Sequence, residues 1–104
     1  MRINYASSKL QKTLQNEKIL LKCYGARQAN KITQRMSELF AANSLHDIGC
    51  NRATRLHTLS GQYKECFAID LVHPFRLVFK PEDGDKNDFT SITIVKIIEI
   101  IDYH

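Results

Sequence analysis

The last three residues, Asp102, Tyr103 and His104, bring a carboxylate, a phenol and an imidazole together directly after an apolar stretch. All three groups can transfer protons, and histidine does so near neutral pH. Tyrosine can also stack on an exposed base of a single-stranded nucleic acid, or anchor the chain in a core. Position alone leaves these roles open, because the ends of a chain often have no fixed conformation.

Arg76 and Lys80 lie four residues apart in a stretch whose alternate positions are apolar. In a β-strand this spacing puts both cations on one face and the apolar side chains on the other. A guanidinium fixed on a strand suits phosphate, because its planar fork of donors can bind two oxygens. We therefore expect a sheet with one buried face and one open cationic face, although a merely solvated face would show the same pattern.

More cations precede this strand, namely Arg55, His57 and Lys64. Cleavage of RNA without a metal needs a base for the 2′-hydroxyl, an acid for the leaving 5′ oxygen, and cations for the charged phosphorane. The residue types for all three tasks are present. The sequence has no glycine-rich nucleotide loop, hydrolase motif or metal-ligand motif, so we expect neither a metal nor a cofactor. His46 and His73 fall in a loop and a turn and are interpreted as incidental.

Two helices are predicted in the N-terminal half, after a short strand over residues 1–5. Ser7 or Ser8 would cap the first helix, and Gly25 would end it. The second helix carries a clean apolar stripe with helical spacing, made of Ala29, Ile32, Met36, Leu39 and Phe40. The polar residues 43–51 predict a loop after this helical hairpin.

Three strands are predicted in the C-terminal half, over residues 67–71, 75–80 and 91–101. The first two are joined by three residues, which is too short for anything but an antiparallel pair. The third, dense in β-branched residues, is the best candidate for a central strand. The order β-α-α-β-β-β predicts one α+β domain over residues 1–104, with the helical hairpin on one face of a small, mainly antiparallel sheet.

Basic residues are concentrated at the start of the chain. Residues 1–35 contain eight Lys or Arg against one acid, whereas residues 36–104 contain seven against ten, and the net charge is +4. Such a patch favours nucleic acid or an acidic protein surface as a partner. With no apolar segment long enough for a membrane helix or a signal peptide, and three cysteines that predict reduced thiols, we expect a cytoplasmic protein without membrane contact.

Four blocks in order, with compatible spacing, resemble the HigB-like toxins of the RelE/ParE superfamily. They are RLHTLSG (residues 55–61), FAIDL (67–71), HPFRLVFKP (73–81) and IIEIIDYH (97–104). The N-terminal half matches more loosely, through its basic helical hairpin and Tyr24–Gly25 junction. The resemblance thus spans essentially the whole chain and implies a RelE-like fold.

This resemblance implies a type II toxin that cuts messenger RNA in the ribosomal A site and so inhibits translation. His57 and His104 would transfer protons, Arg76 would bind the scissile phosphate, Asp102 would orient or act as a base, and Tyr103 would stack. Arg55, Lys64 and Lys80 are weaker candidates for RNA contacts, proposed from their charge.

The family also implies ribosomal RNA as a partner and a neutralising helix-turn-helix antitoxin, through which alone the toxin would meet operator DNA. Three alternatives remain open: a ParE-like gyrase inhibitor, an RNA-binding module without turnover, and a copy that has lost its activity.

Overall fold

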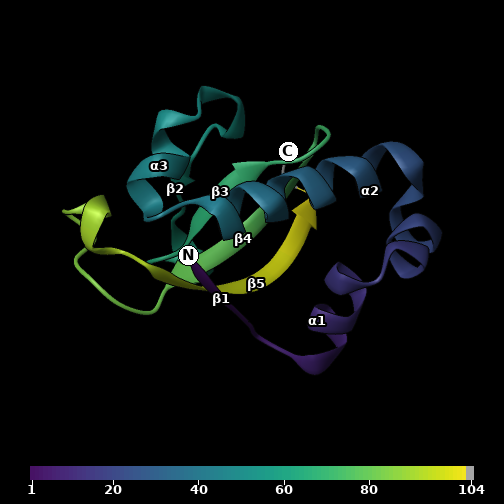
Figure 1. Cartoon of the computed structure of the whole chain (residues 1–104), viewed down its shortest axis with the longest axis horizontal. Coiled ribbons are helices and arrows are strands. Elements are labelled where there is room, and N and C mark those ends of the chain that lie inside the picture. The colour runs from purple at the N-terminus through teal and green to yellow at the C-terminus, as the bar shows by residue number, and fades with distance from the viewer. Residues whose placement is uncertain (103–104) are drawn as a thin grey trace.

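The computed structural model describes residues 1–102, and Tyr103 and His104 lie outside the described residues. Within residues 1–102 there are three α-helices and one five-stranded sheet. The predicted α+β class with a mainly antiparallel sheet is confirmed. The longest helix crosses one face of the sheet (Figure 1).

The strands lie side by side in the order β1-β5-β4-β3-β2. Their bounds are Arg2–Tyr5 for β1, His57–Thr58 for β2, Phe67–Asp70 for β3, Phe75–Pro81 for β4 and Ile94–Asp102 for β5. Strand β1 is parallel to β5, and every other neighbouring pair is antiparallel. Strand β5 is paired on both sides, as its composition predicts, but the central position belongs to β4.

The α-helices are α1 (Ser8–Gln15), α2 (Glu17–Ala41) and α3 (Leu45–Cys50). Ser7 caps α1 as predicted, because its hydroxyl accepts a hydrogen bond from the Leu10 N–H. The prediction of a single helix up to Gly25 is wrong. Asn16 has extended backbone angles that end α1, and its side chain caps α2. Gly25 does interrupt the helical geometry, and its φ of +78° is one that glycine adopts without steric cost.

The core lies between α2 and the sheet. Its fully buried side chains come from the helix stripe and from alternate positions of β3, β4 and β5, among them Ile32, Leu39, Ile69, Leu77 and Ile97. Four of the five predicted stripe residues are buried, but Phe40 is 53% exposed. Phe40 comes four residues after Met36, so helical spacing places it on the stripe, but it stands at the C-terminal end of α2, one residue before the last residue Ala41.

Two elements appear that the sequence did not predict. The loop expected over residues 43–51 contains α3, which buries Leu45 and Ile48 against the core. Strand β2 has only two residues, too few for an alternating pattern, and is defined by its pairing with β3. The observed order is therefore β-α-α-α-β-β-β-β.

Short 3₁₀-helices link the strands: η1 (Arg52–Thr54), η2 (Gly61–Tyr63) and η3 (Phe89–Ser91). None of the helices within residues 1–102 has the length and apolar character needed to cross a bilayer.

A β-bulge changes which residues of β5 share a face. Val78 pairs with Glu99, while the next residue, Phe79, pairs with Ile97, so Ile98 is an extra residue in β5. Residues 96 and 99 would alternate to opposite faces in a regular strand. The bulge puts Lys96 and Glu99 on the same face, the one turned away from α2.

The second face of the sheet is less open than expected. Ala68 and Val78 lie on this face, yet both are fully buried. Tyr63, from the segment between β2 and β3, donates its hydroxyl proton to the Glu99 carboxylate and so reaches across the face to β5. The prediction of an open cationic face therefore holds only at the two ends of this face, where Arg76 and Lys80 lie.

Arg35 of α2 is the buried cation of the helical layer, at 3% exposure. Its Nε donates to the Asp70 carbonyl at 2.7 Å, and Nη2 donates to the Ala53 carbonyl at 2.9 Å. The third contact is an ion pair of 2.8 Å with Glu38, one helical turn further on. One side chain thus joins α2 to the end of β3 and to η1.

We expect Arg35→Met to destabilise the fold by about 3 kcal/mol, because each buried polar group left without a partner costs about 1–3 kcal/mol. Urea unfolding followed by circular dichroism measures the loss. Ser37→Ala, on the exposed side of the same helix, is the control and should change stability by less than about 0.5 kcal/mol. Equal losses in the two variants would contradict the role of Arg35.

Candidate active site

Three of the residues expected to do chemistry or bind RNA, Arg55, His57 and Arg76, lie together at one end of the sheet. Arg76, at the start of β4, pairs with Asp70 at the end of β3 on one side and with Ile101 of β5 on the other. Residues directly opposite one another in a sheet share a face. His57 of β2 reaches the same place from the sheet edge, where it pairs with Ala68.

His57 and Arg76 are in direct contact, with Nε2 of the imidazole 2.6 Å from Nη1 of the guanidinium. A guanidinium can only donate, so Nε2 accepts and carries no proton. On the other side of the ring, Nδ1 lies 2.6 Å from the Arg55 carbonyl oxygen, which can only accept. The two contacts fit the tautomer with the hydrogen on Nδ1 and the lone pair of Nε2 directed at Arg76.

Asp70 is a member of this cluster that the sequence reasoning missed. Its carboxylate lies 3.4 Å from Nε of Arg76 and 3.4 Å from Nε of Arg55. Among residues 1–102, no group donates a hydrogen bond to its buried Oδ1, so the ion pair with Arg76 is its partner on that side. Asp70 is the polar residue of FAIDL, two before the turn that leads to Arg76, and strand pairing alone would have brought the two together.

The backbone behind Asp70 is fixed from the helical layer. The Asp70 carbonyl accepts from Arg35, while its side chain faces the two arginines of the site. Arg35 also holds Ala53, two residues before Arg55. Arg55 itself has a φ of +49°, an uncommon conformation for a residue other than glycine. Arg35 thus fixes the backbone at Asp70 and close to Arg55, the two members of this ion pair.

A hollow of about 130 Å³ opens beside the cluster and is lined by Arg55, Asp70, Leu71, His73, Pro74, Phe75 and Arg76. The lining residues that the structure describes include two arginines and one carboxylate, which together carry a net positive charge. Arg76 is held in place, with its side chain only 22% exposed, whereas Arg55 is 73% exposed. The hollow can therefore accept an anionic group such as a phosphate between one fixed and one mobile guanidinium.

The C-terminal strand places Asp102, the one residue of the predicted triplet that the structure describes, at the same end of the sheet. Asp102 pairs with Phe75, next to the Arg76–Ile101 pair. By alternation, Asp102 is turned toward the face that α2 covers, and Arg76 toward the other. Tyr103 and His104 lie outside the described residues.

The two lysines predicted to contact RNA lie away from the His57–Arg76 pair. Lys64 is exposed and directly follows η2, and Lys80 is exposed near the end of β4. Lys80 pairs with Lys96 across β4 and β5. Directly opposed like charges destabilise a sheet, so an anion bound between them would relieve the repulsion.

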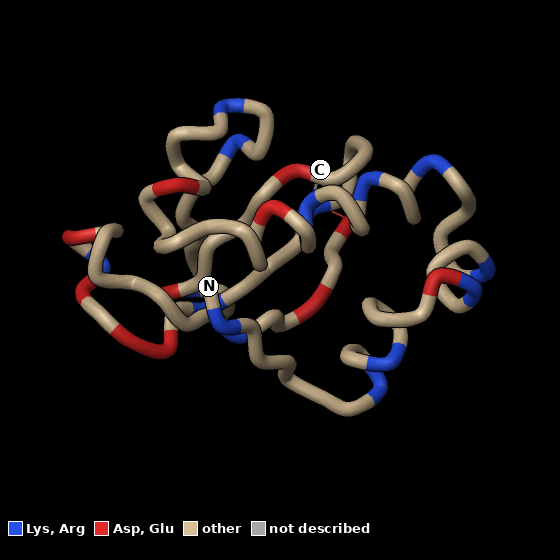
Figure 2. The backbone as a smooth tube through the Cα atoms, in the orientation of Figure 1, with Lys and Arg blue, Asp and Glu red and all other residues tan. Residues whose placement is uncertain are grey.

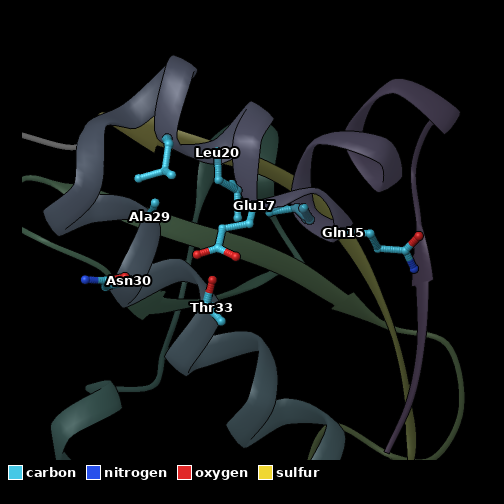
Figure 3. A pocket seen from close by; sticks show the side chains of 8 residues that line it. Gln15, Glu17, Leu20, Ala29, Asn30 and Thr33 are labelled. Atoms are coloured by element: carbon cyan, nitrogen blue, oxygen red, sulfur yellow. The ribbon is translucent and has the colours of Figure 1, made fainter.

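Another hollow, of about 250 Å³, lies between α1 and the bend of α2 (Figure 3). It is lined largely by the apolar side chains of Leu14, Leu20, Leu21 and Ala29, and the Glu17 carboxylate points toward Thr33. Its lining contains no cation and no nucleophilic thiol. It therefore lacks the groups that phosphate binding or nucleophilic chemistry requires.

No known family model matches this chain, and a search of curated proteins returned no match either. The fold and the cluster define a small α+β protein with a cationic hollow beside a histidine in contact with an arginine.

Hydrogen bonding to Glu99, with burial and the carboxylate charge adding to it, raises the pKa of Tyr63 above its ordinary value. We expect Glu99→Gln to lower this pKa toward about 10. Phenolate absorbance during a pH titration measures it, and subtraction of a Tyr63→Phe titration isolates the signal of this tyrosine. A raised pKa in the folded state stabilises the fold below the unfolded value of about 10, and this stabilisation disappears as the pH rises through the folded value. An unchanged difference titration in Glu99→Gln would contradict the assignment.

Proposed function

We propose that this chain is the toxin of a type II toxin–antitoxin pair, a ribosome-dependent messenger RNA endoribonuclease of the HigB-like branch of the RelE superfamily. Support comes from the four sequence blocks, the first three of which contain the cluster residues Arg55, His57, Asp70 and Arg76. A helical layer on one face of a mainly antiparallel sheet supports a RelE-like fold. The protein would act in the cytoplasm, where translating ribosomes are.

The observation that carries the proposal is the 2.6 Å contact between His57 Nε2 and Arg76 Nη1. It combines an unprotonated nitrogen with a cation at one point. A phosphate that enters the hollow would attract the Arg76 guanidinium and release Nε2 from its hydrogen bond. Binding of the scissile phosphate would thus expose the base at the moment when it is needed.

The reaction follows from these groups. His57 Nε2 takes the proton of the ribose 2′-hydroxyl, and the 2′ oxygen attacks the adjacent phosphorus. The bond from phosphorus to the 5′ oxygen breaks, and an acid supplies the proton that this oxygen needs. His104 is our candidate for the acid, and Asp102 for orienting it. The products are a 2′,3′-cyclic phosphate and a free 5′-hydroxyl.

Arg76 has the electrostatic part in this reaction. Negative charge accumulates on the phosphorane oxygens, and a positioned guanidinium stabilises that charge. Asp70 prevents Arg76 from rotating away, because its carboxylate lies 3.4 Å from Nε. Arg55, Lys64 and Lys80 would hold the flanking RNA, and Tyr103 would stack on a base of the message.

The ribosome and an antitoxin complete the proposal. Messenger RNA would be cut in the A site, and ribosomal RNA would contact the basic surface of the toxin. A helix-turn-helix antitoxin would neutralise it, and the toxin would meet operator DNA only within that complex. Metal or cofactor is not required by the chemistry proposed.

Purified protein added to translating ribosomes should create new 5′ ends at A-site codons, mapped by primer extension. His57→Ala should lower the cleavage rate by about 10²- to 10⁴-fold, which is what a general base contributes. Arg76→Ala should lower it similarly, through lost stabilisation of the phosphorane. His46→Ala, an exposed histidine of α3 outside the cluster, is the matched control and should cut at the wild-type rate.

Absence of cuts, with growth still arrested on expression, would favour a ParE-like gyrase inhibitor. Retention of RNA on the ribosome without any cut would favour a binding module. Cuts that persist unchanged in His57→Ala would sink the assignment of this histidine as the base.

A further inference from the structure

A larger hollow adjoins the candidate active site. It has a volume of about 480 Å³ and lies between α2 and the turn that joins β3 to β4. Its lining residues are Arg27, Asn30, Lys31, Gln34, Leu71, Val72 and His73. We call it the α2 groove.

The α2 groove adjoins the hollow at Arg76. Leu71 and His73 line both of them. A strand that places one phosphate at Arg76 can therefore extend past His73 into the α2 groove. The hollow between α1 and α2 shares no described lining residue with the hollow at Arg76.

The floor of the α2 groove is fixed. Gln28 is 7% exposed, and its side chain makes two hydrogen bonds with the backbone of Val72. Its Nε2 donates to the Val72 carbonyl at 3.1 Å, and the Val72 N–H donates to its Oε1 at 2.8 Å. This pairing holds the β3–β4 turn against the helix, so the groove is present before any ligand binds, which lowers the cost of binding.

The groove is lined for an anionic polymer. Arg27 and Lys31 are four residues apart on α2 and so lie on one side of it. Among the described lining residues there is no Asp or Glu. Asn30 and Gln34 add amides that can donate and accept hydrogen bonds, as 2′-hydroxyls and base edges require. Figure 2 shows basic positions spaced along α2, while acidic positions gather in the loop between β4 and β5, at the far end of the molecule.

We propose that the α2 groove binds the sugar–phosphate backbone of single-stranded RNA next to the cut, with Arg27 and Lys31 each contacting a phosphate. The inference rests on the proposed function, because the strand in the groove is the continuation of the strand cut at Arg76. The shared residues Leu71 and His73 favour RNA over an acidic protein, because one strand with a phosphate at every nucleotide can occupy both adjoining hollows.

The test compares two double variants of the full chain. Arg27→Gln with Lys31→Gln removes both charges from the groove, and glutamine keeps the helix propensity. Lys18→Gln with Lys22→Gln is the matched control, since both lysines are exposed on α2 and neither lines the groove. The probe is a fluorescent single-stranded RNA, methylated on its 2′ oxygens so that it cannot be cut, and anisotropy gives its Kd.

We expect the groove variant to bind the probe at least tenfold more weakly than the control variant. The slope of log K against log salt concentration should fall by about 0.7 for each lost phosphate contact. His46→Ala, an exposed residue that lines neither the α2 groove nor the hollow at Arg76, should keep the affinity of the wild type. In the ribosome assay the groove variant should need a higher protein concentration for half-maximal cutting.

Equal Kd values and salt slopes for the two double variants would overturn the groove, whether or not the ribosome assay shows cutting. So would a polyglutamate peptide that displaces the RNA and binds more tightly than it does, because this would identify an acidic protein as the occupant. A weakened groove variant together with no ribosomal cutting in the wild type would leave the groove standing as an RNA surface and overturn the proposed nuclease alone.

Discussion

Arg35 connects the helical layer to both segments that build the candidate active site. Its guanidinium is almost completely buried, and burial of an unpaired charge is very costly. The fold therefore has to supply partners, which are the Asp70 carbonyl, the Ala53 carbonyl and the Glu38 carboxylate. A lysine could not replace it, because only the planar fork reaches three acceptors in different directions. The contacts of Arg35 thus couple the packing of α2 on the sheet to the alignment of β3 with η1.

The cluster at Arg76 is therefore positioned by contacts that come from the helical layer. Asp70 is fixed through its backbone by Arg35, and its side chain then restrains Arg76. Arg76 meets the lone pair of His57, whose tautomer is set by the Arg55 carbonyl. A phosphate that enters the hollow finds the cation already oriented, and such preorganisation is where electrostatic catalysis gains most. On the helix side, Gln28 holds the β3–β4 turn and so fixes the shape of the α2 groove before a ligand binds.

The face of the sheet turned away from α2 shows how local irregularities redistribute charge. Because of the bulge at Ile98, Glu99 shares a face with Lys96 and receives the Tyr63 hydroxyl. This contact draws the segment between β2 and β3 over Ala68 and Val78, whose burial removes apolar area from water. Cationic character is left at the two ends of the face, with the His57–Arg76 pair at one end and the opposed Lys80 and Lys96 at the other.

Patterns of local physics determined most of the fold. Alternation and β-branching predicted β3, β4 and β5, the three-residue link forced the β3–β4 hairpin, and helical spacing predicted the core stripe of α2. The residue types of the site, His57 and Arg76 above all, were also evident from the sequence. Tertiary structure alone decided what has no local pattern: a two-residue strand defined by its partner, a bulge that exchanges faces, and the contacts of Arg35, Asp70 and Gln28. These depend on segments distant in the chain, because a buried polar group is satisfied by whichever backbone the fold brings to it.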